Sequence, residues 1–138
     1  MTVTDPNLDT LARAEPETLK QFAETLIADL GEIEVLHSRT GLVMLPMRDT
    51  AKGVAFHLGE VLVSQAHIRA EGHEAYGLRR GHDLEAAMAM ALVDLALLRG
   101  IRVSECTAFC AQAAAEQAQA DRARLSRIEA TRVNMETF

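Results

Sequence analysis

The apolar stretch from Asp83 to Leu98 constrains the fold of this chain more than any other feature. Nearly every position in it is apolar, and Asp94 is the one charged residue in its C-terminal half. A helix that is apolar on every side must be covered on every side, and a chain of 138 residues has little material for wrapping it. The sequence therefore predicts a partner protein that covers part of this helix.

Length and composition are those of one ordinary domain. At 138 residues and 49% hydrophobic content, the chain has enough apolar material for one core. We assign residues 1–138 to a single domain, with 1–6 as a flexible tail and 131–138 as a C-terminal extension. Because the N-terminus is unlike a signal peptide and no uncharged apolar run reaches ~18 residues, we expect a cytoplasmic protein without a membrane span.

Charge is distributed unevenly along the chain. The net charge is −6, and residues 1–35 hold eight acids against Arg13 and Lys20, whereas acids and bases balance in the remainder. An acidic face disfavours phosphate backbones, and five aromatic residues without Trp offer few stacking platforms. Nucleic acid is therefore not an expected partner.

The first half of the chain has the pattern of one or two helices followed by strands. An apolar helical period begins at Leu8, and a firmer one fills residues 15–31. Three turn signals then separate the strands: Thr40-Gly41, Gly59-Glu60 and Glu71-Gly72. A hairpin whose turn is centred on Thr40-Gly41 pairs His37 with Met44 and Leu36 with Leu45. Centring the last places Arg69 opposite Glu74 and His67 opposite Tyr76.

Two of the expected strand segments are apolar on both faces. They are Leu42–Leu45 and Val61–Val63, and such strands are usually covered on both sides. The helices of this chain can cover one side, and a second chain the other.

The second half of the chain has the pattern of two helices. Asp83 suits the N-cap of the apolar helix and Gly100 its C-terminal stop. An Ala-rich and then Arg-rich helix follows over about 104–130 and, at ~1.5 Å per residue, would be about 40 Å long. The predicted fold is therefore α+β: one or two helices, an antiparallel sheet of four or five strands, a buried helix and a long C-terminal helix.

Two groups of polar residues are candidate sites. Arg79, Arg80, Gly81, His82 and Asp83 bring cationic side chains to a helix N-terminus, a combination that can hold a phosphate. The alternatives are an interface, or a solvated turn whose arginines pair with the acidic N-terminal helix. Asp94, among apolar neighbours, is a candidate buried ion pair that could form across an interface. The competing interpretation makes it catalytic.

Histidines and cysteines do not predict a metal site. The five histidines, His37, His57, His67, His73 and His82, lack the spacings of metal sites, and the expected hairpins make no two of them cross-strand neighbours. Cys106 and Cys110 lie four residues apart beside Phe109 and are expected to pack as small apolar residues. Because no nucleophile–base cluster and no phosphate-binding loop occurs, the catalytic residues stay unknown.

The motifs, taken in order, resemble those of a known family. They are Thr40-Gly41-Leu42-Val43-Met44, Gly59-Glu60-Val61-Leu62-Val63-Ser64, Gly81-His82-Asp83 with Ala87, Ala91, Leu92 and Asp94, and Ala130-Thr131-Arg132-Val133. Over about residues 11–138 the chain resembles PhnG, a small subunit of the bacterial carbon–phosphorus lyase system for phosphonate use.

The resemblance implies a place in a core complex with PhnH-, PhnI- and PhnJ-like subunits. With a PhnL-like protein, the G, H and I members convert ATP and an alkylphosphonate into ribose 1-alkylphosphonate 5-triphosphate and adenine. The nucleosidase chemistry is implied for PhnI and the radical iron–sulfur chemistry for PhnJ. PhnG would then be a helper with no cofactor of its own, ATP being a substrate of the complex.

Three functional hypotheses follow. The leading one is an obligate complex subunit, which is expected to self-associate or precipitate when alone. The second is an enzyme whose phosphate-handling site combines Asp94, His82 and the Arg79-Arg80 turn. The third is a stand-alone regulatory protein that binds a phosphate or phosphonate at the Gly81 turn.

Overall fold

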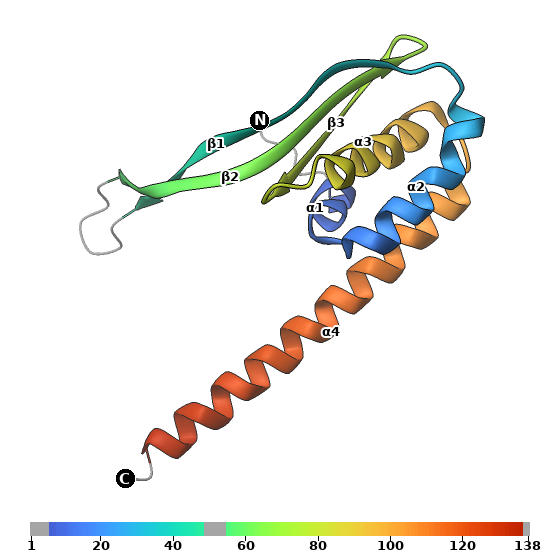
Figure 1. The fold of residues 1–138 in the computed structure, drawn as a ribbon. Helices are drawn as coiled ribbons and strands as arrows, with labels where there is room; N and C mark the ends of the chain where they lie inside the picture. The colour runs from blue at the N-terminus through green and yellow to red at the C-terminus, as the bar shows by residue number, and fades with distance from the viewer. Residues whose placement is uncertain (1–5, 49–54, 137–138) are drawn as a thin grey trace.

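The fold is α+β, as the sequence predicts, with helices on one face of a small antiparallel sheet. The computed structural model describes residues 6–48 and 55–136. Its elements, in chain order, are α1 (Pro6–Arg13), α2 (Pro16–Leu30), β1 (Glu34–Arg48), β2 (Ala55–Ala70), β3 (His73–Arg80), α3 (Leu84–Arg99) and α4 (Val103–Glu136) (Figure 1). None of the helices in these ranges combines the length and the apolar character needed to cross a membrane.

Within residues 6–48 and 55–136 the sheet has three strands in the order β1-β2-β3, fewer than the four or five that the sequence predicted. Thr40-Gly41 and Gly59-Glu60 lie inside long strands, where Thr40 pairs with Ser64 and Gly59 with Leu45. Neither Gly41 nor Gly59 has a positive φ, so neither has the backbone of a tight hairpin turn. The β1–β2 connection falls at residues 49–54, outside the described ranges.

The third turn signal is confirmed together with its register. Glu71 and Gly72 have φ values of 52° and 78°, the positive values that a two-residue hairpin turn requires. Arg69 pairs with Glu74 and His67 with Tyr76, as expected.

The helix boundaries are close to those predicted. Glu15 caps α2, where its carboxylate accepts from the Thr18 N–H at 2.8 Å. Asp83 caps α3, and Gly100 ends it with a left-handed φ of 72°. The last helix runs on to Glu136, past the expected end near Ala130, while residues 1–5 of the expected tail lie outside the described residues.

The covering of α3 corrects the opening prediction from the sequence. Residues 86–87 and 89–96 of this helix are buried by the chain itself. The sheet covers one side, and α1, α2 and the start of α4 contact the others (Figure 1). A partner is therefore not needed to bury most of α3. Leu98, at the end of the helix, is half exposed.

Small residues make this enclosure possible, because they let the sheet and α3 approach closely. Gly77 of β3 lies directly against the backbone of α3, and a Cβ added there would stand 1.9 Å from the carbonyl oxygen of Ala87. Ala66 and Ala75 are fully buried on the same face. We call this enclosed part the head: α1, α2, α3, β3, residues 34–41 and 63–70 of the sheet, and α4 as far as Asp121.

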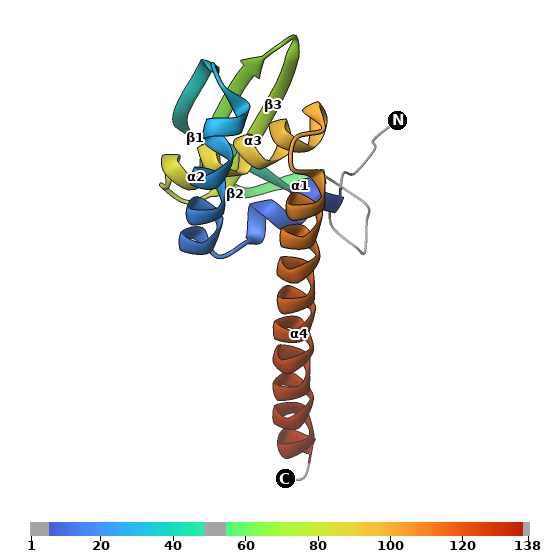
Figure 2. The same ribbon diagram turned by 90° about the vertical axis from the view of Figure 1, so that its right-hand side faces the viewer.

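Two parts of the chain extend beyond the head (Figures 1 and 2). The first is the end of the β1–β2 hairpin that reaches past β3, residues 42–48 and 55–62, which we call the arm. The second is α4 beyond Asp121, which leaves the head as an isolated helix. Both parts carry apolar side chains that no other element of the described chain covers fully.

Candidate functional site

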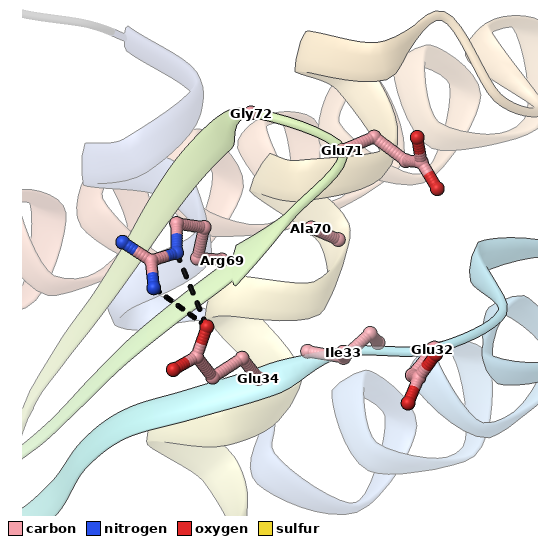
Figure 3. A pocket seen from close by; sticks show the side chains of 7 residues that line it. All are labelled: Glu32, Ile33, Glu34, Arg69, Ala70, Glu71 and Gly72. Carbon is pink, nitrogen blue, oxygen red and sulfur yellow. Dashed lines mark hydrogen bonds and ion pairs between the residues drawn. The ribbon is translucent and has the colours of Figure 1, made fainter.

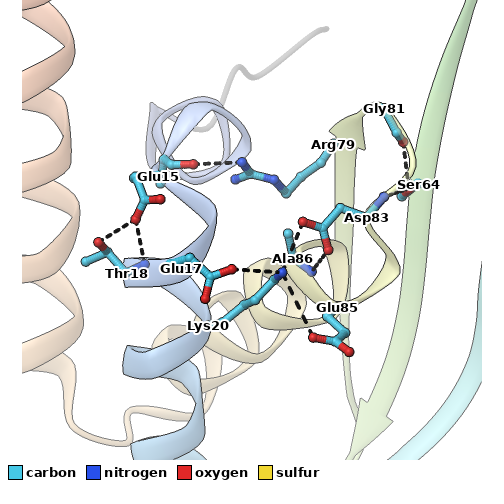
Figure 4. Close-up of polar contacts among 11 residues, drawn as sticks. Glu15, Glu17, Thr18, Lys20, Ser64, Arg79, Gly81, Asp83, Glu85 and Ala86 are labelled. Atoms are coloured by element: carbon cyan, nitrogen blue, oxygen red, sulfur yellow. Dashed lines mark hydrogen bonds and ion pairs between the residues drawn. The ribbon is translucent and has the colours of Figure 1, made fainter.

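The residues that the sequence singles out from Arg79 to Asp83 form the corner between β3 and α3 (Figure 4). Gly81 has a φ of 93°, its N–H donates to the Leu62 carbonyl at 2.8 Å, and its own carbonyl accepts from the Ser64 hydroxyl at 2.7 Å. The Asp83 N–H donates to the same Ser64 oxygen at 2.8 Å. The buried Ser64, which the sequence offered only as part of a family motif and not as a candidate site residue, therefore fixes this corner to β2.

The Asp83 carboxylate occupies the N-terminus of α3. It accepts from the Ala86 N–H at 3.0 Å and lies 3.1 Å from the Lys20 ammonium group. The backbone hydrogen bond from Ala86 and the nearby Lys20 hold the pKa of this carboxyl below its usual range. A phosphate bound at this helix end would have to displace Asp83 or lie beside it.

Arg79 is an internal structural contact rather than a free cation. Its side chain is nearly buried, and its guanidinium donates to the carbonyls of Leu11 at 2.5 Å and Ala14 at 2.7 Å. Burial lowers the pKa of this guanidinium, while Asp83 and Glu15 favour its charged form. Arg79 thereby satisfies backbone carbonyls at the end of α1, rather than pairing with an acidic side chain of the N-terminal helices.

Arg80 and His82 are exposed, so the corner divides into an internal and an external half. Arg79 and Asp83 contact the head, whereas Arg80 and His82 remain available to a ligand or a partner. The phosphate-binding and interface assignments of this corner now depend on these two side chains.

Asp94 lies well away from the corner. It is buried on α3 and has an interaction partner within the chain. At the standard helical rise, it stands about 16 Å along the axis from Asp83. The structure therefore does not bring Asp94 and the corner together into the combined catalytic site of the enzyme hypothesis.

A row of rings crosses the face of the sheet opposite α3. His37 pairs with His67, so the expectation that no two histidines are cross-strand neighbours is wrong, because it rested on the misplaced hairpins. Ring centroids lie 5.9 Å apart for His37 and His67 and 4.2 Å apart for His67 and Tyr76. Glu74 is near this row, with its carboxylate 3.6 Å from His67 Nε2.

This row is not part of a recognisable metal site. Among the described residues, no group of three or more His, Cys, Asp or Glu side chains is arranged to hold a metal ion. Cys106 and Cys110 are buried in α4, and burial raises the pKa of the Cys106 thiol. That thiol is therefore a poor nucleophile at neutral pH.

An open hollow of about 660 Å³ lies between the start of β1 and the β2–β3 turn (Figure 3). Three carboxylates line it, Glu32, Glu34 and Glu71, together with Arg69. The Arg69 guanidinium donates to Glu34 at 2.6 Å and 3.2 Å, which leaves the hollow acidic. An acidic hollow whose one lining arginine is already paired is a poor site for a phosphonate or a nucleotide triphosphate.

The arm exposes apolar side chains on both of its faces. Leu42 and Leu62 pair across it on one face and are 63% and 41% exposed, while Val43, on the other face, is half exposed. Met44, which follows Val43, is also half exposed. A strand ribbon with apolar side chains on both faces and an unpaired edge is a hazard for aggregation unless another surface covers it. The arm therefore has the character of an interface.

Comparison with known proteins places the chain in a family. The sequence profile described as "Phosphonate metabolism protein PhnG" matches residues 6–138. The chain is also 31% identical over 108 residues to a protein of Stutzerimonas stutzeri named "Putative C-P lyase subunit protein HtxH". That match covers 69% of this chain but 29% of the relative, so the chain spans less than a third of the relative's length. Because the profile match includes every helix and strand of the fold, the chain belongs to the PhnG family of phosphonate metabolism proteins.

Proposed function

We propose that this chain is a subunit of a carbon–phosphorus lyase complex that needs it for assembly. The observation that carries the proposal is the family match over the whole described fold, together with the exposed apolar arm. The name of the Stutzerimonas stutzeri relative, a putative C-P lyase subunit, supports the same role. An apolar surface of this kind is typical of a subunit whose interfaces form permanently.

The reaction we propose for the complex is the activation of an alkylphosphonate with ATP. PhnI-, PhnH- and PhnJ-like subunits are the proposed core partners, and a PhnL-like protein joins them for this step. The product is ribose 1-alkylphosphonate 5-triphosphate, with adenine released. Since the reaction consumes ATP, the proposal places the complex in the cytoplasm.

Within that complex, the chain contributes surfaces rather than a reactive group of its own. Arg79 and Asp83 are engaged inside the head, and Asp94 is distant from them along α3. Arg80 and His82 are the exposed members of the predicted site and can meet a substrate that a partner subunit holds. We therefore expect a supporting role in catalysis, without a resident cofactor.

Reconstitution tests this proposal. The PhnI-, PhnH-, PhnJ- and PhnL-like proteins are purified with and without this chain, and adenine release from ATP and methylphosphonate is measured. We expect stable co-elution and adenine release with the chain, and loss of both without it. Equal turnover and an unchanged complex without the chain would contradict the proposal.

The corner variants identify the chain's own contribution to turnover. Arg80→Gln and His82→Gln alter exposed side chains and should leave assembly intact. A fall in turnover with normal assembly would indicate contact with the substrate, whereas unchanged turnover would assign these residues to the surface alone. Asp94→Asn serves as the control for the enzyme hypothesis, because full turnover in that variant excludes catalysis by this acid.

A further inference from the structure

The part of α4 beyond Asp121 continues the face with which the same helix packs on the head. Cys106, Cys110 and Ala113 are buried on that face, Gln117 donates to the Thr10 carbonyl at 3.0 Å, and Asp121 accepts from Arg13 at 3.3 Å. After Asp121 the head ends while the helix runs on to Glu136. The packing face therefore extends past the surface that it packs against.

Apolar residues follow on that same face. Leu125 and Ile128 come four and seven residues after Asp121, the spacing of one helix side. Ile128 lies about five helical turns beyond the buried Cys110, almost in line with it. Leu125 is 58% exposed and Ile128 56% exposed. The stripe that is buried at the near end of α4 is thus repeated at the far end, where the head does not cover it.

Basic side chains border this stripe. Arg122 and Arg124 flank it, and Arg127 lies one turn beyond Arg124, whereas Glu129 is the one acid in residues 122–131. The Arg124 guanidinium forms an ion pair with the Asp121 carboxylate at 3.5 Å, and the Arg124 side chain remains two-thirds exposed. A surface that fits this segment is apolar at its centre and carries carboxylates at its edge.

The length of the projection supports an interface role. An isolated helix of this length is only marginally stable in water, and a helix with two large aliphatic residues on one face gains stability when that face is buried. The opposite face of the same segment carries Ala123, Ala130 and Ser126, which are small and exposed. The large aliphatic residues of the segment therefore lie on the side that continues the head's own packing.

We propose that residues 122–131 of α4 are a docking helix for another subunit of the complex. That subunit lies beside α1, in line with the head, and it receives Leu125 and Ile128 in an apolar groove bordered by acidic side chains. This inference rests on the proposed function, since it takes the partner from among the other subunits. It adds which surface of the chain binds and what chemistry the partner's surface has.

Two matched double variants test the docking helix. Leu125→Glu/Ile128→Glu places two carboxylates on the proposed contact face, and Ala123→Glu/Ala130→Glu places two on the opposite face. Both pairs change the charge equally at exposed positions of one helix. Each variant is co-expressed with the PhnH-, PhnI- and PhnJ-like subunits, and its affinity for the tagged complex is measured, with helical content followed by circular dichroism.

We expect the contact-face variant to bind about 30-fold more weakly or worse, because central apolar contacts dominate interfaces. The opposite-face variant should bind like the original chain. Arg122→Gln/Arg124→Gln should weaken binding by a smaller factor and flatten its dependence on salt.

The outcomes separate this inference from the proposed function. If the unaltered chain does not bind the other subunits, both are wrong. If the unaltered chain binds and the contact-face variant binds equally well, the docking helix alone is wrong. If the arginine variant and the unaltered chain respond identically to salt, the acid-bordered groove is wrong.

Discussion

The strands β1 and β2 run through both the head and the arm, and these two parts differ in whether other elements cover the strands. On β2, Ile68 points toward α3 and is fully buried, whereas Leu62, on the same side of the same strand, is 41% exposed. The difference arises because α3 and β3 cover the strand as far as Val63 and the hairpin continues beyond them. Side-chain polarity alone therefore does not tell which apolar residues form the core and which form an interface.

The sequence predicts more apolar side chains than the chain can bury, and the structure shows where the exposed ones lie. The sequence points both to α3 and to the strand segments Leu42–Leu45 and Val61–Val63. The structure encloses α3 by small-residue packing within the head, whereas Leu42 and Leu62 stay exposed as that second prediction expects. The most exposed large apolar side chains among the described residues are Leu42 of the arm and Leu125 and Ile128 of α4. The head also exposes single apolar side chains to a smaller extent, among them Ile27, Val35 and Leu78. An apolar helix such as α3 needs neighbouring elements on every side. In a short chain, the elements that cover α3 cannot also cover the arm.

The largest expected effect contrasts one leucine of the head with one of the arm. Leu95→Ala removes a fully buried side chain and should destabilise the chain by about 3 kcal/mol. Leu42→Ala changes an exposed side chain and should alter stability by less than about 0.5 kcal/mol. Urea unfolding of both variants measures the difference. Similar losses from the two variants would mean that the arm is part of the folding core.

The second contrast uses one substitution at two glycines. Gly77→Ala drives a methyl group into the Ala87 carbonyl and should cost about 2–3 kcal/mol through overpacking. Gly59→Ala points a methyl group into open space and should be nearly neutral. Thermal unfolding followed by circular dichroism reports both. A neutral Gly77→Ala variant would show that β3 and α3 do not approach as closely as described.

Adjacent arginines give the third contrast. Arg79→Met leaves the carbonyls of Leu11 and Ala14 without their donor and should destabilise the head by about 1–3 kcal/mol. Arg80→Met changes an exposed side chain and should have little effect on unfolding. Equal and small changes in the urea midpoint would indicate that Arg79 is not a structural contact and would return it to the candidate phosphate ligands.

The smallest effect is a pH dependence at the corner. The pKa of Asp83 is lower in the folded chain than the ordinary carboxyl value of ~3.9 in the unfolded chain. Its contribution to stability is therefore complete above that value and is lost as the pH falls through the lower folded pKa. Asp83→Asn keeps a helix cap but removes the charge beside Lys20.

We expect this variant to be about 0.5–1 kcal/mol less stable than the unaltered chain at pH 7. The two should converge in urea unfolding once the pH has fallen through the lowered folded pKa, where the carboxyl is protonated in both states. A difference that is independent of pH would contradict the assigned role of the carboxylate.

Local turn and cap chemistry made part of this fold predictable. Asp83 and Gly100 mark the two ends of α3 because a capping carboxylate and a left-handed glycine have few other uses. Glu71-Gly72 likewise gave the correct register. Thr40-Gly41 and Gly59-Glu60 misled, because glycine also occurs within strands, and sequence composition does not reveal whether its φ is positive.

The candidate site was less predictable than the fold. The motif from Arg79 to Asp83 correctly indicated a helix N-terminus, but its spacing could not show that Arg79 points inward to α1. The role of Ser64 depends on a contact between residues distant in the sequence, and so does the pairing of His37 with His67. Such contacts follow from the strand register. If one turn is predicted at the wrong residues, every cross-strand pair that depends on it is predicted wrongly.

Hydrogen–deuterium exchange of the chain alone and in the reconstituted complex tests the central claim most directly. The head is predicted to be protected in both states, whereas residues 42–44 of the arm and 122–131 of α4 exchange quickly in the free chain and slowly in the complex. Unchanged exchange of these segments on assembly, or equal protection of arm and head in the free chain, would contradict the claim that partners cover the arm and the projecting helix.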